Sequence, residues 1–173
     1  MKNKKVVCHN RYGEKHEVDS SELFFRPSVY GVLVEGDKVL LSKQWDGYDF
    51  PGGGIYIHET IDEALEREFW EETGLKVKRG NIVACESNFF TSDLSKKSAN
   101  FILTYFLVNK IDGEISIDNI DTEESRYIDM PEWIDLKDID KIKFYNNVDS
   151  PKLIREAIKI NKNYENINFR REG

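Results

Sequence analysis

The stretch Gly53–Leu75 reads GGIYIHETIDEALEREFWEETGL and predicts a helix with both ends marked in the sequence. Thr60 is suited to be the N-cap residue, and Glu63 three residues later completes a capping box ahead of an apolar run. Gly74 can adopt the left-handed conformation that commonly ends a helix. The sequence therefore predicts a helix from Ile61 to Thr73.

The acidic residues of this helix fall on the side that should face the core. At about 100° per residue, Glu68, Glu71 and Glu72 share one face of the helix. In the earlier turns the same side carries the apolar residues that the helix is expected to bury, which are Ile61, Ala64 and Leu65. Partly buried carboxylates repel one another and lose hydration, so a cation should lie nearby.

Two kinds of cation fit this acidic face. Arg67 lies four residues before Glu71 and can pair with it. Divalent metal ions are the other candidate, because hard cations prefer carboxylate oxygens. The alternative is an ordinary solvent-exposed helix face held by side-chain pairs, which would need no metal ion. The glycine turn 51–54 and the inward position of the acidic residues favour a site.

The same residues resemble the Nudix box of the Nudix (MutT-like) hydrolases. Gly53, Glu59 and the run Arg67–Leu75 (REFWEETGL) match every glycine, glutamate and arginine of that pattern in register. Phe69 stands where the family usually has an aliphatic residue, which indicates a change in packing. Two residues just before the box glutamate also differ from the common acidic residue and glycine, namely Tyr56 and His58.

The resemblance implies roles for the helix residues. Glu68, Glu71 and Glu72 would be metal ligands, and Glu72 or Glu71 would also be the catalytic base. Arg67 would be a catalytic residue that holds those carboxylates by charge-assisted hydrogen bonds. Gly53 and its neighbour Gly54 would let the backbone turn tightly beside the metal and the phosphates.

Further substrate contacts are implied outside the helix. Glu59 would brace the loop, with a role close to the metal as the alternative. A glutamate outside the box often joins such sites, and Glu123 or Glu124 occupies a suitable position, although an exposed acidic turn explains them equally well. Candidates for stacking or phosphate contact are Phe89, Phe90, Tyr127, Trp133, Lys43 and Arg26, which could instead be ordinary core and surface residues.

The resemblance implies hydrolysis, dependent on Mg²⁺ or Mn²⁺, of the diphosphate bond in a nucleoside diphosphate linked to another moiety. A nucleotide-sanitising pyrophosphohydrolase would be one such enzyme. The metal would lower the pKa of bound water and neutralise the phosphoryl charge. The resemblance also bears on the subfamily. A proline downstream of the box is usual in ADP-ribose pyrophosphatases, and none lies between Pro51 and Pro131, which argues against that activity. A tyrosine plays the same part for diadenosine polyphosphate hydrolases, and none lies between Tyr56 and Tyr105, which argues against that activity as well.

Two other functions stay open. One is a catalytically inactive Nudix-like module that binds nucleotides or regulates, although such domains usually lose glutamates that this chain keeps. The other is an isomerase of the isopentenyl diphosphate type, which needs an early catalytic cysteine and further metal-binding histidines. Cys8 lies very early and the chain has 3 histidines, so the sequence favours this isomerase least.

The pattern of strands and helices predicts an α/β fold, a three-layer α/β/α sandwich around a mixed central sheet, and the Nudix resemblance implies the same. Ala99–Val108 is the most hydrophobic run and should be a central strand. The other expected elements are a hairpin of Lys4–His9 and Glu14–Val18, strands Ser28–Glu35 and Lys38–Trp45 joined at Gly36 and Asp37, an extended run Lys76–Phe90, short strands Glu114–Ile117 and Arg126–Met130, a turn at Pro131–Trp133, and a final helix Lys152–Lys162.

Length and charge bound the remaining possibilities. The 173 residues are expected to form one domain, with residues 161–173 as a polar tail that frays. The net charge of −7 argues against a nucleic-acid polymer as partner, and no run is apolar enough for a membrane span.

Cys8 and Cys85 have no metal-binding spacing and are expected to be buried thiols in a cytoplasmic protein. A monomer or a homodimer is expected.

Overall fold

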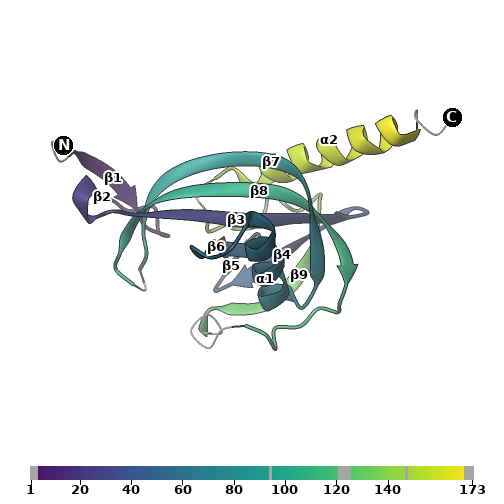
Figure 1. The fold of residues 1–173 in the computed structure, drawn as a ribbon, viewed down its shortest axis with the longest axis horizontal. Helices are drawn as coiled ribbons and strands as arrows, with labels where there is room; N and C mark the ends of the chain where they lie inside the picture. Colours follow the sequence, from purple (N-terminus) through teal and green to yellow (C-terminus); the bar gives the residue numbers. More distant parts are fainter. Residues whose placement is uncertain (1–3, 94, 121–125, 147, 170–173) are drawn as a thin grey trace.

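A curved mixed sheet with a helix on either side makes up the computed structural model, which describes residues 4–93, 95–120, 126–146 and 148–169 (Figure 1). The elements, in chain order, are β1 (Lys5–His9), β2 (Lys15–Asp19), a 3-10 turn (Ser20–Glu22), β3 (Phe24–Glu35), β4 (Lys38–Gln44), β5 (Gly47–Asp49), β6 (Gly52–Gly54), α1 (Ile61–Thr73), β7 (Lys76–Thr91), β8 (Ser98–Asp112), β9 (Ile128–Asp135) and α2 (Ser150–Phe169). The expected fold class, a mixed sheet between helices, is confirmed.

Strand β3 connects the parts of the sheet. The strand order is β2-β1-β7-β8-β3-β4-β5, with β6 paired to β3 and β9 paired to β4. Phe24–Val32 runs parallel to β8, while Leu33–Glu35 pairs with β4 in the expected hairpin. Ser28–Tyr30 pairs with the three glycines of β6, directly ahead of α1. The long central strand therefore fixes where the glycine turn and the acidic helix lie.

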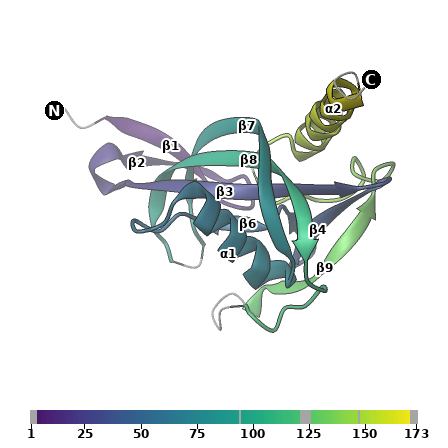
Figure 2. The same ribbon diagram turned by 45° about the vertical axis from the view of Figure 1, so that its right-hand side comes forward.

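The two faces of the sheet carry two separate hydrophobic clusters. Side chains alternate along β3, so that Val29 and Leu33 pack with α1 while Val32 packs with α2. The helix residues Ala64, Leu65 and Phe69 complete the first cluster, and Leu153, Ile154 and Ala157 complete the second. Figure 2 shows the two helices on opposite sides of the sheet. No helix in the described part of the chain has the length and apolar character of a membrane span.

Helix α1 has the bounds and the caps that its sequence predicts. Thr60 and Glu63 form the capping box, and Gly74 ends the helix with a φ of 72°. Glu68 and Glu72 lie on the buried face together with Ala64 and Leu65. The expectation for Ile61 was wrong: this residue is 43% exposed, because the first turn of α1 projects beyond the core.

The expected turn at Pro131–Trp133 was wrong. These residues belong to β9, which begins at Ile128 rather than at Arg126. Proline is compatible with this strand because the β4–β9 pairing changes register between Leu41 and Lys43, opposite Met130 and Pro131. A bulge is one of the few positions in a sheet that tolerates a residue without an N–H group.

The short strand expected at Glu114–Ile117 is absent from the described structure. The chain turns at Gly113, which has a φ of 94°, and passes the C-terminal end of α1. There the Ser116 amide donates to the Thr73 carbonyl at 3.0 Å. This amide therefore satisfies a helix-end carbonyl instead of joining a strand.

Other expectations were met in part. The N-terminal hairpin is confirmed as β1 and β2, and β8 is central as expected. Helix α2 extends beyond the expected Lys162, to Phe169. Cys8 is buried, whereas Cys85 is exposed, contrary to expectation, because its side of β7 is not covered there.

Candidate functional site

Arg67 is the centre of a network that joins α1 to the loop before it. Its Nε and Nη2 donate to the two oxygens of Glu59 at 2.6 and 2.9 Å. Nη1 lies 2.9 Å from Oε1 of Glu68 and 3.1 Å from Oε2 of Glu71, and Nη2 donates to the Gly54 carbonyl at 3.1 Å. The hydrogen bond from Arg67 lowers the pKa of Glu59 to about 2, and the same bond raises the pKa of Arg67. The pair of Arg67 and Glu59 therefore stays charged at neutral pH.

Two glutamates of α1 are buried in the same region. Glu68 is 7% exposed and Glu72 is 3% exposed. The buried hydroxyl of Ser42 donates to Glu72 Oε2 at 2.5 Å. Ser42 stands at the bulge in the β4–β9 pairing, so the strand irregularity and the acidic helix meet at this hydrogen bond.

The donor set suits a hard cation, and in this structure Arg67 pairs with Glu68 and Glu71 while Ser42 donates to Glu72. Among the described residues, no three carboxylate, histidine or cysteine side chains are gathered closely enough to hold one metal ion. A Cβ at Gly53 would lie 2.6–2.7 Å from the carboxylate atoms of Glu68, so a side chain there would displace that carboxylate. Carboxylate oxygens next to an open backbone position fit Mg²⁺ or Mn²⁺. A metal ion there would be a second cation beside this acidic face, with Arg67 Nη1 still holding Glu68 and Glu71.

Gly52 is required for a different reason. Its φ is 148°, and a Cβ there would lie 2.2 Å from the Val29 carbonyl oxygen. No other residue fits this combination of conformation and close approach. The turn therefore brings the backbone of β6 against β3 directly beside the pocket described next.

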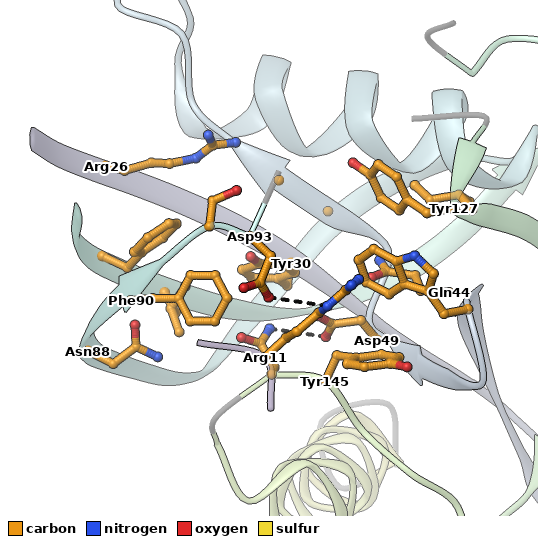
Figure 3. Close-up of a pocket in the computed structure, with 18 of the residues that line it drawn as sticks. Arg11, Arg26, Tyr30, Gln44, Asp49, Asn88, Phe90, Asp93, Tyr127 and Tyr145 are labelled. Atoms are coloured by element: carbon orange, nitrogen blue, oxygen red, sulfur yellow. Dashed lines mark hydrogen bonds and ion pairs between the residues drawn. The ribbon is translucent and has the colours of Figure 1, made fainter. Parts of the chain in front are cut away.

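An open pocket of about 280 Å³ lies next to this turn (Figure 3). Glu72, Gly52 and Gly53 line it from the acidic helix and the glycine turn. The remaining walls come from strands and loops that are far apart in the sequence, through Arg11, Arg26, Tyr30, Gln44, Trp45, Asp49, Asn88, Phe90, Ser92, Asp93, Phe101, Leu103, Tyr127, Ile128, Tyr145 and Asn146.

One wall of the pocket consists of three aromatic rings in contact, with an arginine against one of them. Trp45 stacks on Tyr127 with ring centroids 4.9 Å apart and meets Tyr145 edge-on at 5.0 Å. The Arg11 guanidinium lies 4.3 Å from the Trp45 ring centroid, and its Nε is 3.2 Å from Oδ2 of Asp93. Trp45 has a φ of 47°, which is uncommon for a residue with a side chain. This strained conformation presents the indole to the pocket.

The floor of the pocket holds a buried carboxyl group. Asp49 is 9% exposed, and its Oδ1 accepts hydrogen bonds from Asn146 Nδ2 at 3.0 Å and from the Phe50 amide at 2.8 Å. Burial raises the pKa of Asp49 to about 7. Tyr30 is stacked on Tyr105 with centroids 5.1 Å apart, and burial raises the pKa of Tyr30 as well.

The structure brings together some of the residues predicted from the sequence. Glu72, Gly53, Phe90, Arg26 and Tyr127 line the pocket. Arg67, Glu59, Glu68, Glu71 and the Gly54 carbonyl form the adjacent network. Lys43 pairs with Glu132 at 2.7 Å instead of lining the pocket, and Phe89 and Trp133 do not line it either. Glu123 and Glu124 lie outside the described residues.

Sequence reasoning missed several residues of the pocket, which are Arg11, Trp45, Asp49, Asn146 and Tyr145. None of them belongs to a motif, and the fold alone brings them together. The dipeptide Asp46–Gly47 is typical of a turn and predicts only a change of chain direction. A lone aspartate between aromatic residues in the run 48–50 was the one available hint of a buried acid.

Comparisons with known proteins concern the chain as a whole. A family model described as NUDIX domain matches residues 24–156. An ADP-ribose pyrophosphatase of Methanocaldococcus jannaschii is 26% identical over 170 residues, which cover 90% of this chain and 92% of that protein. An RNA pyrophosphohydrolase of Stutzerimonas stutzeri is 43% identical over 65 residues, and the match spans only 40% of its length and 35% of this chain.

A solved structure shares the fold. The crystal structure of an ADP-ribose pyrophosphatase from Streptococcus suis superposes with a TM-score of 0.60 at 16% identity, covering 80% of this chain and 92% of that one. The family model begins at residue 24, so the hairpin of β1 and β2, which supplies Arg11 to the pocket, precedes the matched region.

Proposed function

Because the chain belongs to the Nudix family, we propose that it hydrolyses the diphosphate bond of a nucleoside diphosphate linked to another moiety, with Mg²⁺ or Mn²⁺ bound at α1. The observation that carries this proposal is that Glu72 and Gly53 line the same pocket as Arg26. A carboxylate, an open backbone turn and a cation thus face one cavity of a size that suits a small ligand.

Glu68, Glu71 and Glu72 would hold the metal. When bound, the metal supplies a water molecule of lowered pKa and neutralises charge on the phosphoryl oxygens. Arg67 holds Glu59 by two hydrogen bonds and keeps the loop and the helix in register. This arrangement fixes the carboxylates before the substrate arrives.

We assign the role of proton acceptor to Glu72 rather than Glu71. Glu72 lines the pocket, and the Ser42 hydroxyl holds its Oε2 at 2.5 Å. Glu71 is engaged by Arg67 at 3.1 Å and does not line the pocket. A base has to reach the proton that it removes, so position favours Glu72.

Arg26 is suited to contact a phosphate. It lines the pocket, and its guanidinium atoms lie 2.8–3.1 Å from the position that a Cβ of Gly54 would take. A guanidinium next to a glycine turn can bind phosphoryl oxygens in a bidentate manner. ADP-ribose is the first substrate to test, since the M. jannaschii relative that matches along most of its length is named for it.

A substrate screen tests the proposal. The purified protein is incubated with ADP-ribose, nucleoside diphosphate sugars, nucleoside triphosphates and dinucleoside polyphosphates, each with Mg²⁺, with Mn²⁺ or with EDTA. We expect release of a mononucleotide from at least one diphosphate compound, only with metal. Tight nucleotide binding without metal-dependent turnover across the panel would overturn the proposal in favour of a binding or regulatory module.

A further inference from the structure

We propose that Asp49 determines substrate selectivity by accepting a hydrogen bond from an N–H group on the base of the bound nucleotide. The inference rests on the proposed function, since it assigns a second part of the same pocket. It concerns the group attached to the diphosphate and not the bond that is broken.

The carboxyl group of Asp49 is only partly satisfied by the protein. The Phe50 amide and the Asn146 amide both donate to Oδ1, at 2.8 and 3.0 Å. Within residues 4–93, 95–120, 126–146 and 148–169, the hydrogen bonds to Asp49 come from these two donors alone, and both end on Oδ1 rather than Oδ2. Asp49 also lines the pocket, so a ligand there can supply the missing donor.

A buried carboxyl group without a cation is costly. Asp49 is 9% exposed, and burial raises its pKa to about 7, which measures the penalty on its charged form. The nearby arginine of the pocket wall does not relieve this penalty, because Arg11 pairs with Asp93 at 3.2 Å. An N–H donor on a ligand would offset part of the cost, and buried polar groups of this kind are normally hydrogen-bonded.

Asp49 and Arg26 line different parts of the same pocket. Tyr30 lies between Arg26 and Asp49 in Figure 3. Burial is the main cause of its raised pKa; Asp49 raises the pKa further and Arg26 lowers it. Arg26 belongs to the proposed phosphate end. Asp49 is therefore on the side of the pocket where the base would lie.

The surroundings favour a flat ring over a flexible sugar. The rings of Tyr30, Phe90 and Trp45 all line the pocket. Aromatic walls with one or two polar groups at the end are typical of sites that bind a planar heterocycle. Asn146, which donates to Asp49 at 3.0 Å, adds a second polar side chain to this part of the pocket.

The test compares wild type with Asp49→Asn on matched substrates that differ only in the base. Asn keeps the shape and, with its oxygen still accepting from the Phe50 amide, presents an N–H donor at the position of Oδ2 instead of an acceptor. We expect kcat/KM for the preferred base to fall at least about tenfold through KM, with kcat changed less than about threefold and the ranking of bases altered. Asp37→Asn, in the exposed β3–β4 turn, is the matched control and should change nothing.

Binding without turnover separates this inference from the proposed function. Calorimetry with the four nucleoside monophosphates and metal-free protein should show a preference among bases that Asp49→Asn loses. An unchanged ranking in both assays, from a variant with a normal thermal unfolding curve, would overturn the inference. The inference would also be overturned if Asp49→Asn weakened the binding of all four nucleotides equally and had no effect on the 2′-deoxynucleotides, because Asp49 would then contact the ribose. If wild type turns over no substrate, the proposed function fails and the binding assay alone decides the role of Asp49.

Discussion

Arg67 and Glu59 are joined by two parallel hydrogen bonds, Nε to Oε1 at 2.6 Å and Nη2 to Oε2 at 2.9 Å. Glu59 precedes the N-cap of α1, whereas Arg67 lies in the middle of the helix. The side chains are 9% and 21% exposed, so the pair is largely removed from water. This link fastens the loop after β6 to the helix that carries the acidic residues.

Replacing Arg67 should destabilise the protein even when the charge is kept. Lysine cannot form the fork that holds Glu59 while also reaching Glu68, Glu71 and the Gly54 carbonyl. We expect Arg67→Lys to lower the free energy of unfolding by about 1–3 kcal/mol in urea titrations. Arg79→Lys is the control, because its pair with Asp62 is exposed and should change stability by less than about 0.5 kcal/mol. Equal effects of both variants would contradict this account.

The low pKa of Glu59 makes part of the stability depend on pH. Its pKa is about 2 in the folded protein, below the usual value of 4.5, so ionised Glu59 stabilises the fold. This stabilisation is complete above about pH 4.5 and is lost as the pH falls towards 2. Glu59→Gln should therefore be less stable than wild type at pH 6 and approach it near pH 2.5. A constant difference across this range, as expected for the exposed control Glu35→Gln, would refute the assignment.

Phe69 and Gly31 should be energetically coupled. A Cβ on Gly31 would lie 2.6 Å from an atom of the Phe69 ring, which is fully buried. Gly31→Ala should therefore destabilise the fold by about 1–3 kcal/mol through overpacking. The same change should cost less in a Phe69→Leu background, where the ring is gone. Thermodynamic cycles from chemical unfolding measure the coupling, and additive effects would show that the two residues do not compete for this space.

The space at Gly53 should be needed for metal binding. A Cβ there would force the Glu68 carboxylate to move, since the closest atom is 2.6 Å away. Gly53→Ala should weaken Mn²⁺ binding, followed by electron paramagnetic resonance, by about 10-fold or more. Gly80→Ala provides a comparison, because its Cβ would meet only the Leu107 backbone and side chain and the Asn109 side chain, at 3.1–3.6 Å. Mn²⁺ affinity that is equal in the two variants would contradict the assignment.

Local features of the fold could be predicted from the sequence, and those that depend on distant contacts could not. The helix 61–73 was predictable because Thr60, Glu63 and Gly74 act within a few residues of its ends. The strand that contains Pro131 was missed, because proline is tolerated there only through a bulge in the pairing with β4. Ser116 was expected in a strand, but its amide is taken by the end of a helix far earlier in the chain.

The candidate site divides in the same way. The network of Arg67 with Glu59, Glu68 and Glu71 follows from spacing along one helix and its preceding loop. The pocket does not, because Arg11, Asp49 and Asn146 come from three separate segments that meet only in the folded chain. The same limit applies to the substrate, since the residues around the pocket and not the motif would select it.

The most direct test of the central claim is the turnover of Glu72→Gln on the best substrate of the screen, in saturating Mg²⁺. Gln is close in shape and can still accept the Ser42 hydrogen bond, but it cannot take up a proton. We predict a loss in kcat of at least about 100-fold with normal thermal unfolding, while Glu66→Gln on the exposed side of the same helix retains wild-type turnover. Undiminished turnover in Glu72→Gln would contradict the assignment of this helix face as the catalytic site.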